Sequence, residues 1–559
     1  MIALGINYFA NTHDSSACIA RDGQVLFAVA EERLSRAKHD ARFPSLAIRA
    51  CLDFAGVRAS DLDLICYSWP KPGAFARHDV KCMLTGALPI SSAGLLTTLR
   101  DYASRTVQQG GRKPFVREFG ETRAEFRFVD HHLAHAISAY AYSGFDEAAV
   151  LVVDGRGASE ATSLWRGRGG KLEHLYTIPF PNSLGLFYAQ FTHYLGFTPF
   201  SDEWKVMGLA PYGEPGIDLG DFIAADEVPY RVATRRLLGD RSCSIAELVK
   251  RFGPARTSES EIEPRHKNIA WAVQDACERA VLGLARDSVK RTGSRNLCLA
   301  GGVALNSKAN GKILSSGAVE RIFVQPAASD DGACLGAVLA PYLDGGGSLP
   351  LAKMRHASLG GECTDAEIEK ALTTYKIRAR RVGCPACVGA ELLAAGKIIG
   401  WVQGRMEFGP RALGNRSILA DPRDPQMTER VNNAVKFREW WRPFAPSMLA
   451  ERAHEYVESA TDSPFMILTA QVRAEKRGVI PAVTHADGSA RPQTVEREVN
   501  PLYWNLIERF DKLTGVPVVM NTSFNLRGEP IVATATDAIR TFFSSGLDAL
   551  VIGHFVVEK

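Results

Sequence analysis

Apolar and polar residues at the start of the chain follow the pattern of a three-stranded meander. Residues 1–33 predict a strand, a polar turn, a second strand, an Asp-Gly turn and a third strand. Residues 148–178 repeat this order, and each copy opens with an apolar strand that runs into a polar, acidic turn. The repeat predicts an internal duplication.

Segments with a helical spacing of apolar residues follow each copy. After the first copy we expect a helix at 45–57 and strands at 62–68 and 125–129. After the second copy we expect helices at 183–197 and 268–291. Two such halves with a cleft between them describe a duplicated α/β fold of the actin-like ATPase type (ASKHA, ribonuclease-H-like), in which nucleotide binds between the lobes.

A glycine-rich stretch with little periodicity, residues 344–362, predicts a domain boundary. We therefore expect one domain over residues 1–350 and a second over residues 351–559. The length of 559 residues agrees, since one domain usually holds about 100 to 200 residues.

Charge and apolar content narrow the class of protein. A net charge of +4 is small for this length, so we expect neither nucleic acid nor a membrane as a partner. No apolar run approaches ~20 residues, and the first residues lack the basic segment of a signal peptide. Eleven thinly spread cysteines are typical of a reducing compartment, and these features together predict a cytoplasmic protein.

One C-x-x-C pair, Cys384 and Cys387, has two interpretations. The first is a zinc or redox site, but no second cysteine pair lies nearby in the sequence to complete a tetrahedral site. The second, which we favour, is a pair of small buried residues at the start of a helix.

Three histidines, His131, His132 and His135, stand at the head of a predicted helix in the segment VDHHLAHAISAYAYS. His131 and His135 are four residues apart, so they share one helix face, and this spacing suits one divalent metal. The alternative is a first helical turn in which imidazoles bond freed backbone groups, and the spacing alone favours that alternative. Asp330 and Asp331 stand at a strand-to-helix corner, where aspartates are also good helix caps.

A short apolar strand runs into Gly301 and Gly302, and a helix is expected to begin near Asn306. Paired glycines let the backbone approach a phosphate or an adenosine, and a helix N-terminus adds partial positive charge. An ordinary strand-to-helix connection also explains the pair. The sequence contains neither the P-loop motif nor the G-x-G-x-x-G fingerprint, which argues against those nucleotide folds.

Cations gather in glycine- and proline-rich loops of the C-terminal part. They are Arg405, Arg411, Arg416, Lys436, Arg438 and Arg442, and a later strand ends in Asn521, Ser523 and Asn525. Arginine offers a planar fork and lysine a point charge to phosphate groups. The alternative is a solvated face paired with acidic residues. Because helical spacing does not explain these cations, we favour an anion site.

Motifs along nearly the whole chain resemble those of one enzyme family. They are HDSSA, DHHLAHA, DGRG, EWKVMGLAPYG, LAGGVALN, DDGACLGA, GRMEFGPRALGNRSI, FREWWRPFAPS and NTSFNLRGEPIV. Nine motifs in this order resemble the O-carbamoyltransferase family of nodulation and antibiotic-tailoring enzymes (NodU, CmcH and TobZ type). The resemblance implies an actin-like N-terminal domain similar to the tRNA-threonylcarbamoyl transferase and an α+β YrdC-like C-terminal domain.

The resemblance also implies a two-step reaction. In the YrdC-like domain, carbamoyl phosphate and ATP would give carbamoyl-adenylate, and in the actin-like domain the carbamoyl group would pass to a hydroxyl of a small molecule, releasing AMP. Motif by motif, both substrates of the first step would be held by Arg411, Lys436, Arg442, Arg491, Asn521 and Ser523.

In the N-terminal domain the resemblance implies a metal held by His131, His135 and Asp330, with Asp154 of the DGRG motif near it. The adenylate would lie beside Gly301, Gly302 and Asn306, and His13 would face the acceptor hydroxyl as a base or as an orienting group. Two imidazoles and a carboxylate suit Fe(II) or a similar divalent metal, with zinc and manganese left open and Mg²⁺ as a further option.

Two other functions compete with transfer to a small alcohol. One is modification of tRNA with threonylcarbamoyladenosine, and the other is a non-catalytic sensor of nucleotide and metal. The weak net charge argues against the tRNA enzyme. The acceptor, which the family suggests is a secondary metabolite or a sugar, and the oligomeric state are not given by these residues.

Overall fold

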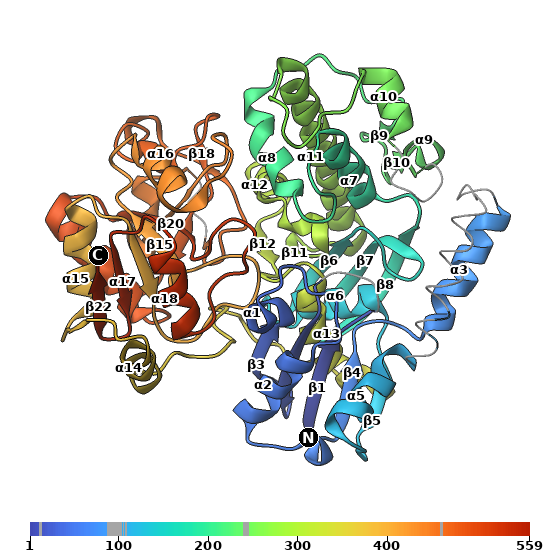
Figure 1. The fold of residues 1–559 in the computed structure, drawn as a ribbon. Coiled ribbons are helices and arrows are strands. Elements are labelled where there is room, and N and C mark those ends of the chain that lie inside the picture. Colours follow the sequence, from blue (N-terminus) through green and yellow to red (C-terminus); the bar gives the residue numbers. More distant parts are fainter. Residues whose placement is uncertain (10–13, 86–102, 104–105, 107–108, 239–244, 459–461) are drawn as a thin grey trace. The chain divides into compact units, whose positions relative to one another are not determined.

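The computed structural model describes residues 1–9, 14–85, 103, 106, 109–238, 245–458 and 462–559 (Figure 1). The chain forms two compact units. The first contains Met1–Glu31 and His39–Met354, and the second contains Glu32–Lys38 and Arg355–Lys559. The division after Met354 lies inside the glycine-rich stretch, whereas the assignment of a short N-terminal segment to the second unit was not predicted.

One five-stranded sheet of the first unit comes from the N-terminal meander. Its strands are β1 (Ile2–Asn7), β2 (Ser16–Arg21), β3 (Gln24–Ala30), β4 (Leu64–Tyr67) and β5 (Glu125–Phe128). Their order is β3-β2-β1-β4-β5, with the meander antiparallel and β4 and β5 parallel to β1. The carboxyl ends of β1, β4 and β5 therefore lie along one edge of the sheet.

A second five-stranded sheet repeats this arrangement. Its strands are β6 (Glu147–Val153), β7 (Glu160–Arg168), β8 (Lys171–Pro179), β11 (Asn296–Ala300) and β12 (Arg321–Val324). The order β12-β11-β6-β7-β8 is again an antiparallel meander, and its first strand β6 pairs in parallel with β11, which in turn pairs in parallel with β12. The predicted internal duplication is confirmed by these matching sheets.

Helices cover both sheets of the first unit (Figure 1). They include α2 (Ser45–Ala55), α6 (His131–Tyr140), α7 (Leu184–Tyr194), α8 (Glu203–Leu209), α11 (Pro264–Thr292), α12 (Ser307–Ser315) and α13 (Ala333–Leu339). The long α11 begins with a proline at its first turn and ends before Gly293 in the left-handed conformation, which are standard start and stop signals. It packs against β6, α7, α8 and α12.

Helices α6 and α13 pack closely on each other, and α6 carries the three histidines of the site described below. Gly336 of α13 lies so close to α6 that a Cβ atom there would stand 1.7 Å from the carbonyl oxygen of Ala134. Only glycine permits this approach. The close contact fixes the position of α6 relative to the loop that precedes α13.

The second unit is built on an eight-stranded mixed sheet of order β13-β22-β21-β14-β15-β20-β16-β19. The strands are β13 (Arg380–Arg381), β14 (Ile399–Val402), β15 (Arg416–Ala420), β16 (Ala445–Leu449), β19 (Gln493–Val495), β20 (Val518–Ser523), β21 (Ala549–Ile552) and β22 (Phe555–Glu558). The helices are α14 (Asp365–Thr374), α15 (Pro385–Ala394), α17 (Pro501–Thr514) and α18 (Ala535–Phe543). Their apolar faces share one core with the sheet, centred on residues such as the fully buried Trp401. The whole chain is thus mixed α/β.

The C-x-x-C pair differs from the favoured interpretation. Cys384 caps α15, as expected of a helix start, but its sulfur is bonded to Cys387 in a disulfide. Three residues of spacing at a helix N-terminus bring the two Cα atoms to 5.3 Å, inside the range that a disulfide requires.

No helix in the described part of the chain has both the length and the apolar character needed to cross a membrane.

Candidate metal centre and anion-binding cluster

The three predicted histidines lie at the first turns of α6. Asp130 caps this helix, because its side chain accepts the backbone N–H of Leu133 at 3.0 Å. The side chains of His131, His132 and His135 have no solvent exposure. Buried imidazoles need partners, and the surroundings of each ring show what it can do.

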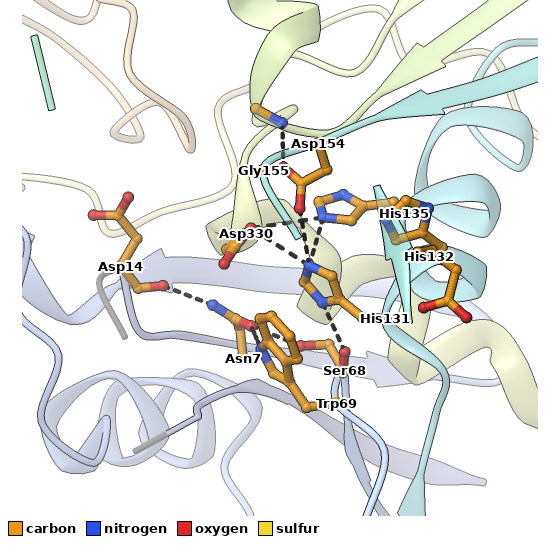
Figure 2. Close-up of polar contacts among 12 residues, drawn as sticks. Asn7, Asp14, Ser68, Trp69, His131, His132, His135, Asp154, Gly155 and Asp330 are labelled. Atoms are coloured by element: carbon orange, nitrogen blue, oxygen red, sulfur yellow. Dashed lines mark hydrogen bonds and ion pairs between the residues drawn. The ribbon is translucent and has the colours of Figure 1, made fainter. Parts of the chain in front are cut away.

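His131 and His135 face two carboxylates at one point (Figure 2). The two Nε2 atoms lie 3.1 Å apart, and His131 Nε2 lies 3.6 Å from Asp154 Oδ2 and 3.5 Å from Asp330 Oδ1. His135 Nε2 lies 3.7 Å from the same oxygen of Asp330. One ligand atom from each of the four residues lies within 4.8 Å of all the others.

These separations fit one bound divalent ion. Ligands about 2.1 Å from an ion stand about 3.0 to 3.4 Å apart in tetrahedral or octahedral geometry. Two imidazole nitrogens and two carboxylate oxygens are also a donor set that several divalent metals accept. The structure therefore brings together all four residues predicted for the metal, and His131, His135, Asp154 and Asp330 could hold it.

The neighbours of His131 orient its ring as a ligand. Its Nδ1 donates to the carbonyl oxygen of Ser68 at 3.1 Å, which leaves the Nε2 lone pair facing the cluster. Trp69 stacks on the ring with a centroid distance of 3.6 Å. Asn7 Oδ1 accepts from the Ser68 hydroxyl at 2.7 Å and from Trp69 Nε1 at 2.8 Å. Asn7, Ser68 and Trp69 thus form a brace behind the imidazole.

The charges of the cluster favour a cation. Although burial opposes it, Asp330 and Asp154 raise the pKa of His131 to about 10. Burial alone would raise the pKa of Asp154, but its hydrogen bond to His131 lowers that pKa to about 2. The cluster without a metal is therefore a proton-holding site, and a divalent ion would take the place of that proton.

Gly301 and Gly302 serve the cluster in this structure. The Gly302 N–H donates to Asp154 Oδ1 at 2.8 Å and fixes the carboxylate. Gly301 has φ 90°, and a Cβ there would lie 2.4 Å from the Val153 carbonyl oxygen. The close approach at this turn is made to β6, the strand that directly precedes Asp154, and the predicted approach to a phosphate or an adenosine stays a prediction.

Asn306 caps α12 by accepting the N–H of Ala309 at 3.1 Å. Its amide also exchanges hydrogen bonds with Gln274 of α11, each of 3.0 Å. The predicted contact of Gly301, Gly302 and Asn306 with an adenylate therefore stays a prediction. His13 lies outside the described residues, and its predicted place beside the acceptor does too.

His132 turns away from the metal cluster. Its Nδ1 lies 2.9 Å from Ser163 Oγ, and burial lowers the pKa of the ring to about 3. The ring is therefore neutral at physiological pH. His132 is therefore not among the four residues whose ligand atoms meet in the metal cluster.

A separate group of cations gathers in the second unit. Lys436 ends a short π-helical segment, Asn432–Lys436, and is 5 % exposed. Its ammonium donates to the Ser523 backbone, to the Asn525 carbonyl at 3.1 Å and to Asn525 Oδ1 at 2.9 Å. Burial, followed by the charges of Arg438 and Arg442, lowers its pKa well below the ordinary lysine value.

Four arginines complete this group. Burial lowers the pKa of Arg411 to about 10, and burial with neighbouring arginines lowers the pKa values of Arg438 and Arg491 still more clearly. Glu439 lies 3.4 Å from Arg442. Arg411 Nε, Arg438 Nη2 and Arg491 Nε have no hydrogen-bond partner among the described residues. We call Arg411, Lys436, Arg438, Arg442 and Arg491 the cationic cluster.

The predicted polar partners lie on the neighbouring strand β20. Asn521 donates to the Ala412 carbonyl at 3.2 Å and to Ser447 Oγ at 3.0 Å, while its own Oδ1 has no partner among the described residues. Ser523 Oγ lies 2.7 Å from Asn525 Oδ1. Through Lys436, the strand end is joined directly to the cationic cluster.

Two arginines expected at the anion site have structural roles. Arg416 is fully buried and donates to the carbonyl oxygens of residues 361, 403, 404 and 415. Arg405 donates to the carbonyl oxygens of Leu359 and Gly360. Including these two in the anion site was wrong, because both guanidinium groups hold loop backbone together.

Sequence reasoning missed the residues that support His131. Asn7 ends β1, and Ser68 and Trp69 follow β4 directly. Carboxyl ends of adjacent parallel strands meet at one sheet edge, where sites are commonly built. That rule, applied to β1 and β4, was the signal that could have found them.

Comparisons with known proteins cover both units. Residues 2–339 match the family Carbamoyltransferase N-terminus, and residues 390–559 match Carbamoyltransferase C-terminus. Nodulation protein NolNO of Sinorhizobium fredii is 42% identical over 563 residues, covering 98% of this chain and 79% of that protein. Nodulation protein NolO of Bradyrhizobium diazoefficiens is 43% identical over 441 residues, covering 77% of this chain and 79% of NolO.

Among solved structures, component A of the (R)-2-hydroxyglutaryl-CoA dehydratase of Acidaminococcus fermentans is similar over 60% of this chain and 96% of its own. Its identity is 13% and its TM-score 0.33, so this likeness carries no argument. The family matches on both halves and the relatives above 40% identity decide the assignment. The chain belongs to the carbamoyltransferase family and is a carbamoyltransferase.

Proposed function

We propose that this carbamoyltransferase works in two steps with ATP. In the second unit, which we take to be YrdC-like, water cleaves carbamoyl phosphate to carbamate and phosphate. A carbamate oxygen then attacks the α-phosphorus of ATP, which gives carbamoyl-adenylate and releases pyrophosphate. In the first unit, which we take to be actin-like, the carbamoyl group passes to a hydroxyl of a small molecule and AMP leaves. The acceptor class is an alcohol such as a secondary metabolite or a sugar.

The cationic cluster is the observation that carries this proposal. Five cations lie together, of which Lys436 is buried and the four arginines are partly buried, and Glu439 is the carboxylate beside them whose charge acts on both Arg438 and Arg442. Buried like charges are costly unless anions compensate them. Carbamoyl phosphate and the triphosphate of ATP are multiply charged anions, and binding them would relieve that cost.

Arginine geometry suits the phosphate groups of both substrates. Guanidinium forks bind phosphate oxygens through paired hydrogen bonds, and Lys436 adds a point charge. Arg411, Arg442 and Arg491 would hold the phosphates, with Asn521 and Ser523 beside Lys436 as polar partners. Arg438 belongs to this set as well, because its charge acts on both Lys436 and Arg442.

The metal cluster supports the second step. We propose Fe(II) or a similar divalent ion between His131, His135, Asp330 and Asp154. When bound, such an ion neutralises negative charge that develops on a phosphate leaving group. Residues of the chain hold the ligands in position. Ser68 and Trp69 fix the His131 ring, and the Gly302 N–H fixes Asp154.

Carbamoyl transfer to an alcohol has three further requirements that the protein must meet. A carbamoyl carbon is a poor electrophile, so the donor must be held within reach of the alcohol. The hydroxyl proton must be removed as the bond forms. Water must be kept from the donor, since hydrolysis would waste it. By the HDSSA motif, His13 would contact the acceptor hydroxyl.

The proposal is tested by incubating the metal-loaded enzyme with ATP, carbamoyl phosphate and a panel of hydroxylated metabolites. We expect one acceptor to gain the mass of a carbamoyl group, together with AMP and pyrophosphate. Arg411→Gln should abolish AMP formation, whereas Arg380→Gln, an exposed arginine on the edge strand β13, should not. AMP formation that does not require carbamoyl phosphate would contradict the proposal.

A further inference from the structure

A second group of polar side chains in the first unit joins a carboxylate, an imidazole and a hydroxyl. Asp14 Oδ1 lies 2.8 Å from His39 Nδ1, and His39 Nε2 lies 2.9 Å from Ser201 Oγ. An ionised carboxylate only accepts, so we assign the ring proton to Nδ1 and let the Nε2 lone pair accept the Ser201 hydroxyl. This order of groups is how proteins make an imidazole into a base for a hydroxyl.

The backbone has positive φ at Asp14 and His39 of this group and at the residue before Ser201. Asp14 has φ 63° and His39 has φ 55°, and Phe200, which directly precedes Ser201, has φ 61°. Side-chain residues rarely adopt positive φ, and such positions gather where a function requires them. Only eight described residues other than glycine have positive φ, and three of them lie here.

Hydrogen bonds hold the three loops in place. The N–H and hydroxyl of Ser15 both donate to the Asp40 carbonyl, at 3.1 Å and 2.9 Å, which pins Asp14 against His39. Trp204 Nε1 donates to the Ser201 carbonyl at 2.8 Å and pins the third loop. The group is therefore arranged before any substrate binds, as general base catalysis requires.

A chain of hydrogen bonds connects this group with the metal cluster (Figure 2). Asn7 Nδ2 donates to the Asp14 carbonyl at 2.7 Å, and Asn7 Oδ1 accepts from Ser68, whose carbonyl holds His131. The carboxylate of Asp14 points away from that cluster in Figure 2. The side chains of His39 and Asp14 retain 31% and 19% of their exposure, so a substrate can reach the ring.

We propose that His39 is the general base of carbamoyl transfer, and that its Nε2 takes the acceptor proton where Ser201 Oγ now lies. The proposal rests on the alcohol acceptor proposed above. The alcohol oxygen forms a bond to the carbamoyl carbon, the bond from that carbon to the AMP oxygen breaks, and AMP leaves with the electron pair. The hydroxyl proton moves to His39 Nε2 and later to water. Of the two roles that its motif implies, His13 keeps the orienting one.

The test uses two probe nucleophiles with ATP, carbamoyl phosphate and the full-length, metal-loaded enzyme. Methanol needs a base to attack the carbamoyl carbon, whereas hydroxylamine attacks it without one. The products measured are methyl carbamate from methanol and N-hydroxyurea from hydroxylamine, each as the rate above that without enzyme. His39→Gly removes the ring at a positive φ that glycine adopts without strain. His174→Gln is the matched control, because His174 Nε2 also lies 2.8 Å from a hydroxyl but on an exposed strand.

We expect the rate of methyl carbamate formation to be about 10²- to 10⁴-fold lower in His39→Gly than in the natural enzyme. The rate of N-hydroxyurea formation should stay within about threefold of the natural one. Added imidazoles should restore methyl carbamate, with rates that rise with the basicity of the imidazole. Ser201→Ala should lose less than about tenfold.

Equal loss of both products in His39→Gly, or unchanged methyl carbamate, would overturn the assignment. A loss in Ser201→Ala as large as in His39→Gly would overturn it in favour of a serine nucleophile. If the natural enzyme makes neither product, the alcohol transfer itself fails, and this inference fails with it.

Discussion

Trp69 lies flat against His131, with their ring centroids 3.6 Å apart and their planes inclined by 14°. The imidazole is thereby held between an aromatic face and the carbonyl of Ser68, with Nε2 directed at Asp154 and Asp330. A ligand fixed in this way loses little freedom when it binds an ion.

Trp69→Leu should therefore weaken metal binding. Loss of the stacking face frees the ring, and outer-shell changes of this kind typically cost about 10- to 100-fold in affinity. Equilibrium dialysis with Co²⁺ as the probe measures it, and Trp504→Leu, in a helix of the second unit, is the control. Unchanged Co²⁺ affinity in Trp69→Leu would show that the stack does not orient the ligand.

Gly336→Ala should destabilise the first unit and disturb the metal cluster together. The new Cβ would stand 1.7 Å from the Ala134 carbonyl, so α13 must move away from α6. Overpacking of this kind costs about 1 to 3 kcal/mol or more. The melting temperature and the Co²⁺ affinity should both fall. Gly73→Ala, where nothing lies within 4 Å of the added Cβ, should change neither.

A stable Gly336→Ala protein with full metal affinity would mean that α6 and α13 can separate without consequence. That result would contradict the tight contact on which the position of His131 and His135 depends.

ATP affinity should fall as the pH rises, at pH values below those at which an ordinary lysine loses its charge. Burial and the charges of Arg438 and Arg442 lower the pKa of Lys436, so its charge is lost at a lower pH than in an ordinary lysine. The charged form binds anions, and therefore affinity is high below that pKa and decreases above it. Calorimetric titration with ATP over a series of pH values below the ordinary lysine pKa of about 10.4 measures the slope.

Lys436→Arg provides the control for this slope, because arginine keeps its charge throughout that range. Its affinity should be nearly constant with pH. An equal decrease in the natural protein and in Lys436→Arg would assign the effect to another group.

The sequence pattern predicted the framework of the first unit well. The duplicated meander and the following parallel strands are visible as runs of apolar residues, and both sheets formed as expected. The spacing of His131 and His135 predicted that they share a helix face, whereas their role as ligands and their carboxylate partners came from the family motifs. These features depend on local pattern or on motifs, which one sequence contains.

Contacts between distant segments were not predictable. Asn7, Ser68 and Trp69 meet only because β1 and β4 are neighbours, and His39 reaches Ser201 across 162 positions. The same limit explains why Arg416 was placed in the anion site. It lies in a glycine-rich loop with other cations, but its side chain is buried among backbone carbonyls. Loop cations look alike in sequence, and only the fold separates those that hold the backbone from those left for a ligand.

The division of labour between the two units is tested most directly with His131→Ala and Arg491→Gln, each assayed for two activities. One is carbamoyl-phosphate-dependent exchange of pyrophosphate into ATP, and the other is carbamoyl transfer to an acceptor. We predict that His131→Ala keeps the exchange and loses transfer, because its change is confined to the metal cluster, whereas Arg491→Gln loses both. Loss of exchange in His131→Ala with the fold intact, or its survival in Arg491→Gln, would contradict the account.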